Sequence, residues 1–496
     1  MRLFPRLAVS FLFSPILGTT VAIAQNSPAA SHEEVEELRQ TVRELAMRVS
    51  ALEDELHKQR ATEPMETASL KPTVLALPHA DIRNSVESVS SSGIAPHVQT
   101  ASSATETPTP QASPQPTVLP TTLPSGATLN YLLDAYYDYD FEHPLGRVQY
   151  LRAYDVLSNA FSINQADIVF DWQPDLAAGR RYGMRVDLQF GQASETLQGN
   201  PVNEPRPEIY RNIFQAYGTY VVPLGKGLNV DFGKWASSLG AEGNYSKDQW
   251  NYSRSYYYYY LPFYHSGVRA SYKLNDNWSL NYWLVNGTNQ SEPTNSFKDE
   301  MFGFAGQPVK NVSWTFNYYF GQDHPDSTPA TNCTAPVQPG LCLAPIIPAP
   351  NGKTHIFDTY ATWNASPNLS FQLEGDYVIQ REWANAAPGE SSAPSHTDGG
   401  AGYVKYQFTP KTALSARAEY LSDRGGLFSG TAQALKEVTG TYSYNVGDGF
   451  LARLEFRRDW SNVPYFLTNK PGVLSKDQPT LTVGLVWWYG AKQGAW

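Results

Sequence analysis

Apolar and polar residues alternate with a period of two over most of the chain, from about residue 125 onward. In one clear segment, Leu454 and Phe456 alternate with Arg453, Glu455 and Arg457. Successive side chains of a β-strand point to opposite faces, so this segment has one apolar face and one charged face. Such a strand fits a wall between lipid and water.

About sixteen segments of this kind follow one another, and the one from Met301 to Gly306 has the weakest alternation. Their predicted starts lie near Leu129, Ser162, Tyr182, Ile213, Leu228, His265, Trp278, Asp299, Val312, His355, Leu369, Gly402, Thr412, Leu435, Gly449 and Pro479. Short turns such as Asn275 to Asn277 alternate with long loops such as Ser237 to Pro262. This alternation is typical of bacterial outer-membrane barrels, whose turns face the periplasm and whose loops face outward.

The sequence therefore predicts an all-β fold, a transmembrane antiparallel β-barrel of about 16 strands over residues 125–496. An even strand number places both ends of the barrel on the periplasmic side. A soluble β-sandwich gives no reason for turns and loops to alternate in length. A propeller would show repeated blade motifs, and the sequence has none.

The first 124 residues follow other patterns. Arg2 and Arg6 precede the apolar stretch Leu7 to Leu17, and the small residues of Ala22-Ile23-Ala24 suit a cleavage site, so residues 1–24 are predicted to be a secretory signal peptide. Residues 61–124 are rich in Ser, Thr, Pro and Ala, without periodicity, and are predicted to be a disordered linker.

Residues 31–60 between them carry a heptad pattern that begins at a capping box formed by Ser31 and Glu34. The apolar core positions are Val35, Leu38, Val42, Leu45, Val49, Leu52 and Leu56. So short a helix is marginal alone, so several copies held together are expected to form a periplasmic coiled coil, most simply a trimer. The alternative is a monomeric amphipathic helix.

Composition narrows the function further. Only 17% of the 496 residues are charged, 13% are aromatic, and the formal net charge is −10. After the N-terminus no run of about 18 apolar residues occurs, which excludes a helical membrane protein. The acidic balance, without a basic tract, argues against nucleic-acid binding.

The chain has two cysteines, Cys333 and Cys342, in one Pro-rich loop. Because an exported chain meets an oxidising environment, they are predicted to form a local disulfide. No HExxH, GxSxG or phosphate-binding glycine loop is present, so neither an enzyme nor a catalytic residue is predicted. Asp323-His324-Pro325-Asp326 is interpreted as a solvated loop rather than a metal site, and no metal is expected.

One block resembles a known family. The order Gly233-Lys234, Gly240-Ala241-Glu242, Ser253-Arg254-Ser255, Pro262 and His265-Ser266-Gly267-Val268 is similar to the OmpL-like β-barrel porins of Gram-negative bacteria. The resemblance implies a passive diffusion channel without cofactors or catalytic residues. A weaker resemblance links the chain to carbohydrate-selective porins, which can also carry an N-terminal coiled coil.

In many sixteen-stranded porins the third external loop folds inward, and here that loop is 237–262. Its charged residues Glu242, Lys247, Asp248 and Arg254 are the candidates for a pore constriction. The aromatic run 256–260 has two readings, a surface for stacking on sugars or part of the aromatic girdle at the membrane interface. The parity that Tyr256, Tyr258 and Tyr260 share with Val268 favours the girdle.

The parity of the strands also predicts which charges face the lumen. The acidic candidates are Asp134, Asp138, Asp167, Asp171, Asp187, Asp231, Asp358, Glu374, Asp376, Glu419, Glu437, Glu455 and Asp459, and the basic ones are Arg185, Arg269, Lys273, Lys405, Arg417, Arg453 and Arg457. The acidic excess predicts mild cation selectivity. The distribution further suggests two facing walls of opposite sign. Alternatively, the charges pair with strand neighbours and merely solvate an unselective lumen.

Together these features predict an outer-membrane porin, a homotrimer surrounded by lipid, that passes small hydrophilic solutes and ions down their gradients. One alternative is a carbohydrate-selective porin. The other is a plugged barrel that acts through its surface loops as an adhesin or binding protein.

Overall fold

The fold is a closed β-barrel, seen in a computed structural model that describes residues 123–198, 204, 206–329, 336–338, 341–342, 346–348, 352–381, 394–447 and 449–491. The predicted signal peptide, coiled coil and nearly all of the predicted linker lie outside the described residues, as does Cys333. Predictions about these segments and about the disulfide therefore stay predictions.

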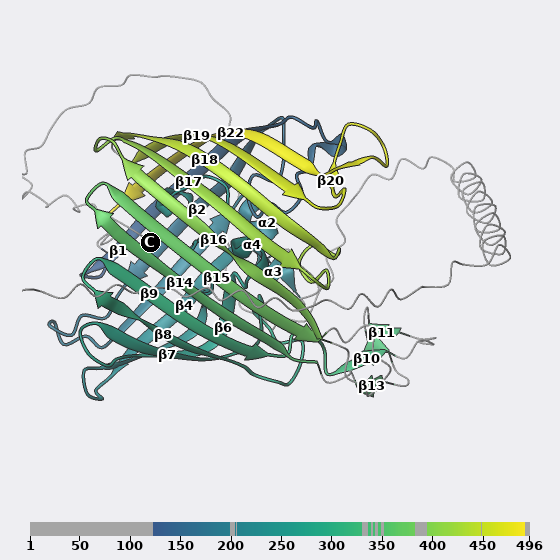
Figure 1. Ribbon diagram of the computed structural model, residues 1–496. Helices are drawn as coiled ribbons and strands as arrows, with labels where there is room; N and C mark the ends of the chain where they lie inside the picture. The colour runs from purple at the N-terminus through teal and green to yellow at the C-terminus, as the bar shows by residue number, and fades with distance from the viewer. Residues whose placement is uncertain are drawn as a thin grey trace, which may run out of the picture. The chain divides into compact units, whose positions relative to one another are not determined.

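Sixteen antiparallel strands form the barrel, and β1 closes it by pairing with β22, where Leu133 lies opposite Trp487 (Figure 1). In chain order they are β1 (Ala127–Asp140), β2 (Ala160–Trp172), β3 (Tyr182–Phe190), β4 (Ile213–Val222), β5 (Leu228–Ala236), β6 (Tyr264–Lys273), β7 (Trp278–Val285), β8 (Asp299–Val309), β9 (Val312–Gly321), β14 (Thr354–Ser366), β15 (Leu369–Arg381), β16 (Pro394–Gln407), β17 (Thr412–Asp423), β18 (Gln433–Gly447), β19 (Phe450–Ser461) and β22 (Asp477–Gly490). The predicted fold and strand number are confirmed.

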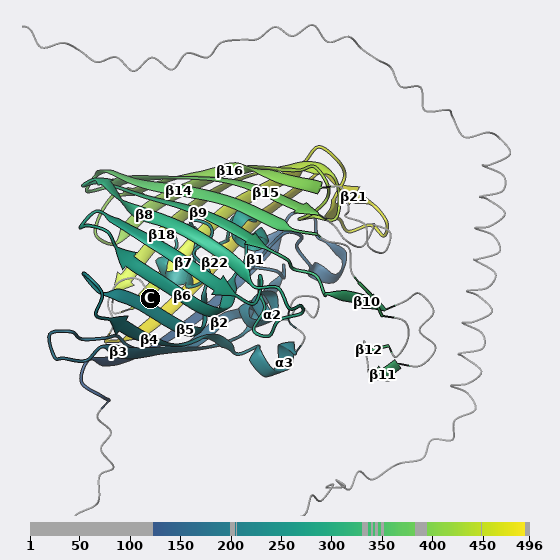
Figure 2. The same ribbon diagram turned by 90° about the horizontal axis from the view of Figure 1, so that it is seen from below.

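Short and long connections alternate around the barrel, as predicted. The short ones include 274–277, 310–311 and 408–411, and the long ones include 141–159, 237–263 and 462–476. Because every short connection lies at one end, β1 begins and β22 ends at that same end (Figure 2).

The long connections carry the remaining elements. These are η1 (Leu145–Arg147), α2 (Gln192–Gln198), α3 (Pro207–Tyr210), η2 (Ser246–Asp248), α4 (Tyr256–Tyr260), β10 (Ser327–Pro329), β11 (Pro336–Gln338), β12 (Leu341–Cys342), β13 (Ile346–Pro348), β20 (Phe466–Leu467) and β21 (Leu474–Ser475). No helix among the described residues combines the length and apolar character needed to cross a membrane.

The two faces of the strands differ as the parity predicts. On β19, Leu454 and Phe456 are 48% and 46% exposed on the outer face, whereas Arg453, Glu455 and Arg457 are buried on the inner face. Outward aromatic side chains gather at the end with the short turns, namely Tyr131, Tyr182, Tyr220, Trp363, Tyr406, Tyr442, Tyr444, Trp487 and Tyr489. This arrangement matches the aromatic girdle of a membrane interface.

All predicted strand starts but one lie within two residues of the observed start. The exception is β16, which was expected near Gly402 and begins at Pro394. Its first half reads PSHTDGG and has no alternation, yet it pairs in register with β15 and β17, as in Ser395 with Gln380 and Gly399 with Leu421. Pairing with both neighbours extends a strand that its own sequence does not predict.

Candidate functional site

The connection between β5 and β6, residues 237–263, folds into the barrel and is called L3 below. Its helix α4 lies within the ring of strands in Figure 1, and its side chains and backbone contact strands from both halves of the chain. Tyr252, for example, donates a 2.9 Å hydrogen bond to Asp134 of β1, and Tyr256 donates one of 2.7 Å to Asp459 of β19. The third long loop therefore lies inside the lumen.

Carboxylates of the barrel wall accept hydrogen bonds from the backbone of L3. Glu455 accepts from the amides of Tyr252 and Ser253, at 2.5 and 2.9 Å. Glu419 accepts at 2.8 Å from the amide of Tyr256. Hydrogen bonds to an ionised acceptor are among the stronger ones in proteins, so these acids fix the path of L3.

Arginines of strands β17 and β19 bind carbonyl oxygens of L3. Arg417 donates to the Ser253 carbonyl at 2.9 Å, and Arg453 donates to the Ser246 carbonyl at 2.7 Å. Arg457 donates to the Arg254 carbonyl at 2.5 Å. The structure places the predicted lumen-facing charges Arg417, Arg453, Glu455 and Arg457 on the inner wall, where they hold L3 rather than line open water.

The expectation of two facing walls of opposite sign is wrong. Arg417 forms ion pairs with Glu437 at 2.8 Å and with Glu419 at 3.1 Å, all three on adjacent strands and buried. Arg457 pairs likewise with Asp459 at 2.7 Å. Arg417 and Arg457 are thus neutralised locally, because a buried charge without a partner is costly, and Arg453 donates to carbonyl oxygens of L3 instead.

The four candidate constriction residues do not form one ring. Glu242 accepts hydrogen bonds from Arg417 at 2.9 Å and from the Ser255 amide, and Lys247 pairs with Asp248 at 2.7 Å. Arg254 is buried and donates to the carbonyls of L3 itself, at Gly243, Asn244 and Tyr252. Glu242 and Asp248 line a cavity beside the loop, whereas Arg254 acts as a brace inside it.

The girdle interpretation of Tyr256, Tyr258 and Tyr260 is wrong. The hydroxyl of Ser255 accepts a 2.9 Å hydrogen bond from the Tyr258 amide and so caps α4, a helical turn in the lumen. The prediction assumed that the alternation of β6 continues back through residues 256–260. It fails because the backbone is helical at these positions. Tyr256 and Tyr257 are fully buried against the inner wall.

The loop 141–159 supports L3 from the side of the long loops. Arg152 pairs with Asp155 at 3.0 Å and with Asp459 at 2.7 Å. Burial raises the pKa of Asp155 to about 6, although the Arg152 charge acts in the opposite direction. Tyr154 and Tyr258 share a 2.7 Å hydrogen bond between their hydroxyls. Strand parity could not identify Arg152 and Asp155, which lie in a loop.

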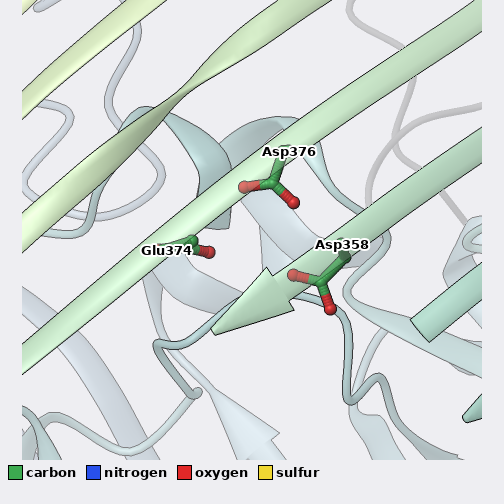
Figure 3. A group of neighbouring side chains, drawn as sticks. All are labelled: Asp358, Glu374 and Asp376. Carbon is green, nitrogen blue, oxygen red and sulfur yellow. The ribbon is translucent and has the colours of Figure 1, made fainter. Parts of the chain in front are cut away.

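Two further predicted pairs lie on the inner wall. Arg185 and Asp187 form an ion pair at 3.0 Å, and Asp187 also accepts a hydrogen bond from Tyr245 of L3. Glu374 and Asp376 of β15 lie beside Asp358 of β14, and Figure 3 shows the three side chains on neighbouring strands. Parity missed several buried charges near strand ends: Asp140, Lys234, Asp299 and Asp423.

The segment 323–326 is less solvated than expected. Asp323 accepts hydrogen bonds from Thr288 at 2.9 and 2.8 Å, and the buried His324 lies 3.1 Å from the carbonyl of Gly352. Asp323 thus links the connection 322–353 to the connection 286–298. In the described part of the chain, the one group of acids, histidines or cysteines close enough to share a metal is Asp358, Glu374 and Asp376.

L3 divides the interior into cavities. One of about 800 Å³ lies on the long-loop side and is lined by Gln149, Tyr259 and Asp323 among others. One of about 740 Å³ lies on the short-turn side, near Gln173, Asn229 and Asp231. A smaller cavity of about 390 Å³ lies between L3 and the wall at Arg185, Gln372 and Tyr403.

Many solved structures are similar to this chain, and three of them, all of low sequence identity, serve as examples. OmpT of Vibrio cholerae is 10% identical, covers 74% of this chain and 99% of its own, and has a TM-score of 0.45. The anion-selective porin of Comamonas acidovorans is 9% identical over 73% of this chain and 99% of its own, with a TM-score of 0.46. The outer-membrane channel DcaP of Acinetobacter baumannii is 11% identical over 74% and 98%, with a TM-score of 0.45.

No curated protein matches the sequence. A family model does match, and it spans residues 126–487, which begin one residue before β1 and end within β22. On this match over nearly the whole barrel, the chain belongs to the family described as "Putative beta-barrel porin-2, OmpL-like".

Proposed function

We propose that this porin conducts small hydrophilic solutes and ions passively through a pathway that L3 narrows, with a mild preference for cations and without a catalytic step. The observation that carries the proposal is the anchoring of L3 inside the lumen, between larger cavities on its two sides. Solutes would pass L3 near the smaller cavity, where Arg185, Glu242 and Asp248 lie.

The preference for cations is supported by inward acids that form no ion pair with a lysine or arginine among the described residues. Arg417 of β17 and Arg457 of β19 are paired with Glu437 and Asp459, so these two arginines add little net field. Two groups of carboxylates remain, Asp134 with Asp167 near β1 and β2, and the group containing Glu374 and Asp376. Carboxylates that line a pore favour cations.

Purified protein in planar bilayers tests both parts. Stepwise, ohmic conductance is expected, and the reversal potential in a KCl gradient should show potassium to be more permeant than chloride. A chloride preference would contradict the selectivity, and no conductance would favour the alternative of a plugged barrel that works through its loops. Block by added oligosaccharide would favour a carbohydrate-selective porin.

A matched pair of variants locates the selectivity. Asp167→Asn removes a lumen carboxylate whose two oxygens have no hydrogen-bond partner among the described residues, and it should reduce the preference for potassium. Asp276→Asn is the control, because Asp276 is 91% exposed in the turn after β6. Equal reversal potentials in the two variants would show that Asp167 does not contribute to the ion selectivity.

We also propose a homotrimer in the outer membrane, with the segment 31–60 in the periplasm as a coiled coil. A groove on the outer face supports an association between copies. Its floor is a row of paired residues, Leu373, Gly402, Ala418 and Val438, with small side chains at its centre.

Native mass spectrometry tests the trimer. Deletion of 31–60 should weaken it, and Ala418→Phe, which fills the groove, should weaken it further. Ala135→Phe adds the same ring to another outward position and is the control, since Ala135 pairs with the outward Leu485 on β22. A trimer that survives both the deletion and Ala418→Phe would exclude these contacts.

A further inference from the structure

Three carboxylates converge on the inner wall because of strand register. Asp358 of β14 lies directly opposite Asp376 of β15, and Glu374 is two residues before Asp376, on the same face. Like charges directly opposite each other destabilise a strand pair. Side-chain oxygens of the three residues lie within 4.8 Å of one another (Figure 3).

No positively charged side chain among the described residues neutralises this concentration of negative charge. No lysine or arginine in the described ranges forms an ion pair with any of the three acids. Asp376 is only 5% exposed, and neither of its carboxylate oxygens has a hydrogen-bond partner in the part of the chain that is described. Asp358 Oδ1 likewise has no hydrogen-bond partner among the described residues. Buried polar atoms of this kind are usually satisfied by a partner, which can be an ion.

The other carboxylate oxygens are held by neighbours from three sides. Asn317 of β9 donates a 2.8 Å hydrogen bond to Asp358. Glu374 accepts from the Ala241 amide of L3 and from the Tyr403 hydroxyl, each at 2.9 Å. Hydrogen bonds of this type orient the ligands of a metal ion before it binds. The unpartnered oxygens of Asp358 and Asp376 remain available.

We propose that Asp358, Glu374 and Asp376 bind a divalent cation of the calcium type at the base of L3. Calcium takes carboxylate oxygens at about 2.3–2.6 Å, so two ligand oxygens on opposite sides of it lie about 5 Å apart. The observed spread within 4.8 Å fits this span. Magnesium suits the site less well, because it dehydrates reluctantly and usually binds through only one or two protein carboxylates.

The site would also stabilise the start of L3. Gly240 has a φ of +85°, and a Cβ there would lie 3.2 Å from Glu374 Oε1, so the loop backbone passes close to the ligand. Asn317 additionally donates to the Ser238 carbonyl at 3.0 Å. Because Glu374 and Asn317 each contact L3, a bound cation would hold the loop base and the wall together.

Calorimetric titration of the chelator-treated, detergent-solubilised full chain with CaCl₂ in KCl buffer tests the site. One calcium per chain is expected, and terbium should bind the same site and luminesce on excitation of the nearby Tyr403. Absence of saturable calcium binding at millimolar concentration would overturn the proposal, whether or not the protein conducts in bilayers.

Substitutions test whether calcium binds at these three carboxylates. Asp376→Asn should weaken calcium binding by about tenfold or more, as should Tyr403→Phe, which removes a support of Glu374 without changing any charge. Asp231→Asn is the matched control, a lumen carboxylate paired with Arg269 at 2.6 Å, and should bind as the unchanged protein does. Heat-modifiable migration on gels confirms folding of each variant. Unchanged binding in folded Tyr403→Phe and Asp376→Asn would overturn the assignment.

Discussion

Arg417 on the barrel wall donates a 2.9 Å hydrogen bond to Glu242 of L3, and both side chains are almost completely buried. The same guanidinium neutralises Glu419 and Glu437. One arginine therefore links the loop in the lumen to two strands of the wall, and its charge is part of the structure of the channel.

We expect Arg417→Ala to destabilise the barrel and to release L3. Removal of one partner of a buried ion pair typically costs about 3–5 kcal/mol, because the remaining charge is left uncompensated. In bilayers the variant should show larger and noisier conductance, and its unfolding temperature should fall.

Arg424→Ala is the control for this change. Arg424 pairs with Asp398 at 2.8 Å but is 59% exposed, and such surface pairs contribute about 1 kcal/mol or less. If Arg417→Ala and Arg424→Ala behave alike in conductance and in unfolding, the anchoring role of Arg417 is wrong.

The buried tyrosine of α4 gives a second prediction. Tyr256→Phe keeps the ring and removes the hydroxyl that donates to Asp459 at 2.7 Å. A hydrogen bond to a charged group contributes about 1.5–3 kcal/mol, so the free energy of unfolding should fall by that order. Tyr442→Phe, on the outward face of β18, should change it little. If the two substitutions change the free energy of unfolding equally, the buried position of Tyr256 and its hydrogen bond to Asp459 are contradicted.

The barrel could be predicted from sequence because its dominant force is local. A strand between lipid and water must alternate, and Leu454 to Arg457 show it residue by residue. The first half of β16 lacks this signal, since both faces of its Gly-rich stretch are small or polar. Its extent depends on the hydrogen bonds that β15 and β17 offer.

The candidate site was less predictable because it depends on contacts between distant segments. Parity predicts that Arg453 and Glu455 face inward, but it could not show that L3 would meet them there. Likewise, the proximity of Asp358 to Asp376 follows from the pairing register of β14 and β15, which one sequence does not reveal.

The two cysteines give a third prediction, which rests on the sequence alone. If Cys333 and Cys342 are bonded in the exported protein, alkylation should label neither until a reductant is added. Mass spectrometry of unreduced peptides should show the pair as one linked species. Labelling of both thiols in unreduced, freshly purified protein would show them to be free.

The outer face of β5 gives the last prediction. Phe232 is 72% exposed near the middle of the strand, where the model of a lipid-facing surface requires an apolar side chain. Phe232→Lys should cost roughly 2 kcal/mol or more, because a lysine deep in the bilayer is penalised in proportion to its depth. Asn229→Lys on the same strand places an equal charge in the inner cavity on the short-turn side and should be tolerated. Folding into lipid vesicles, followed by the gel shift between unfolded and folded barrel across a urea series, measures both. A destabilisation of Asn229→Lys that equals that of Phe232→Lys would contradict the assignment of the two faces of the strand.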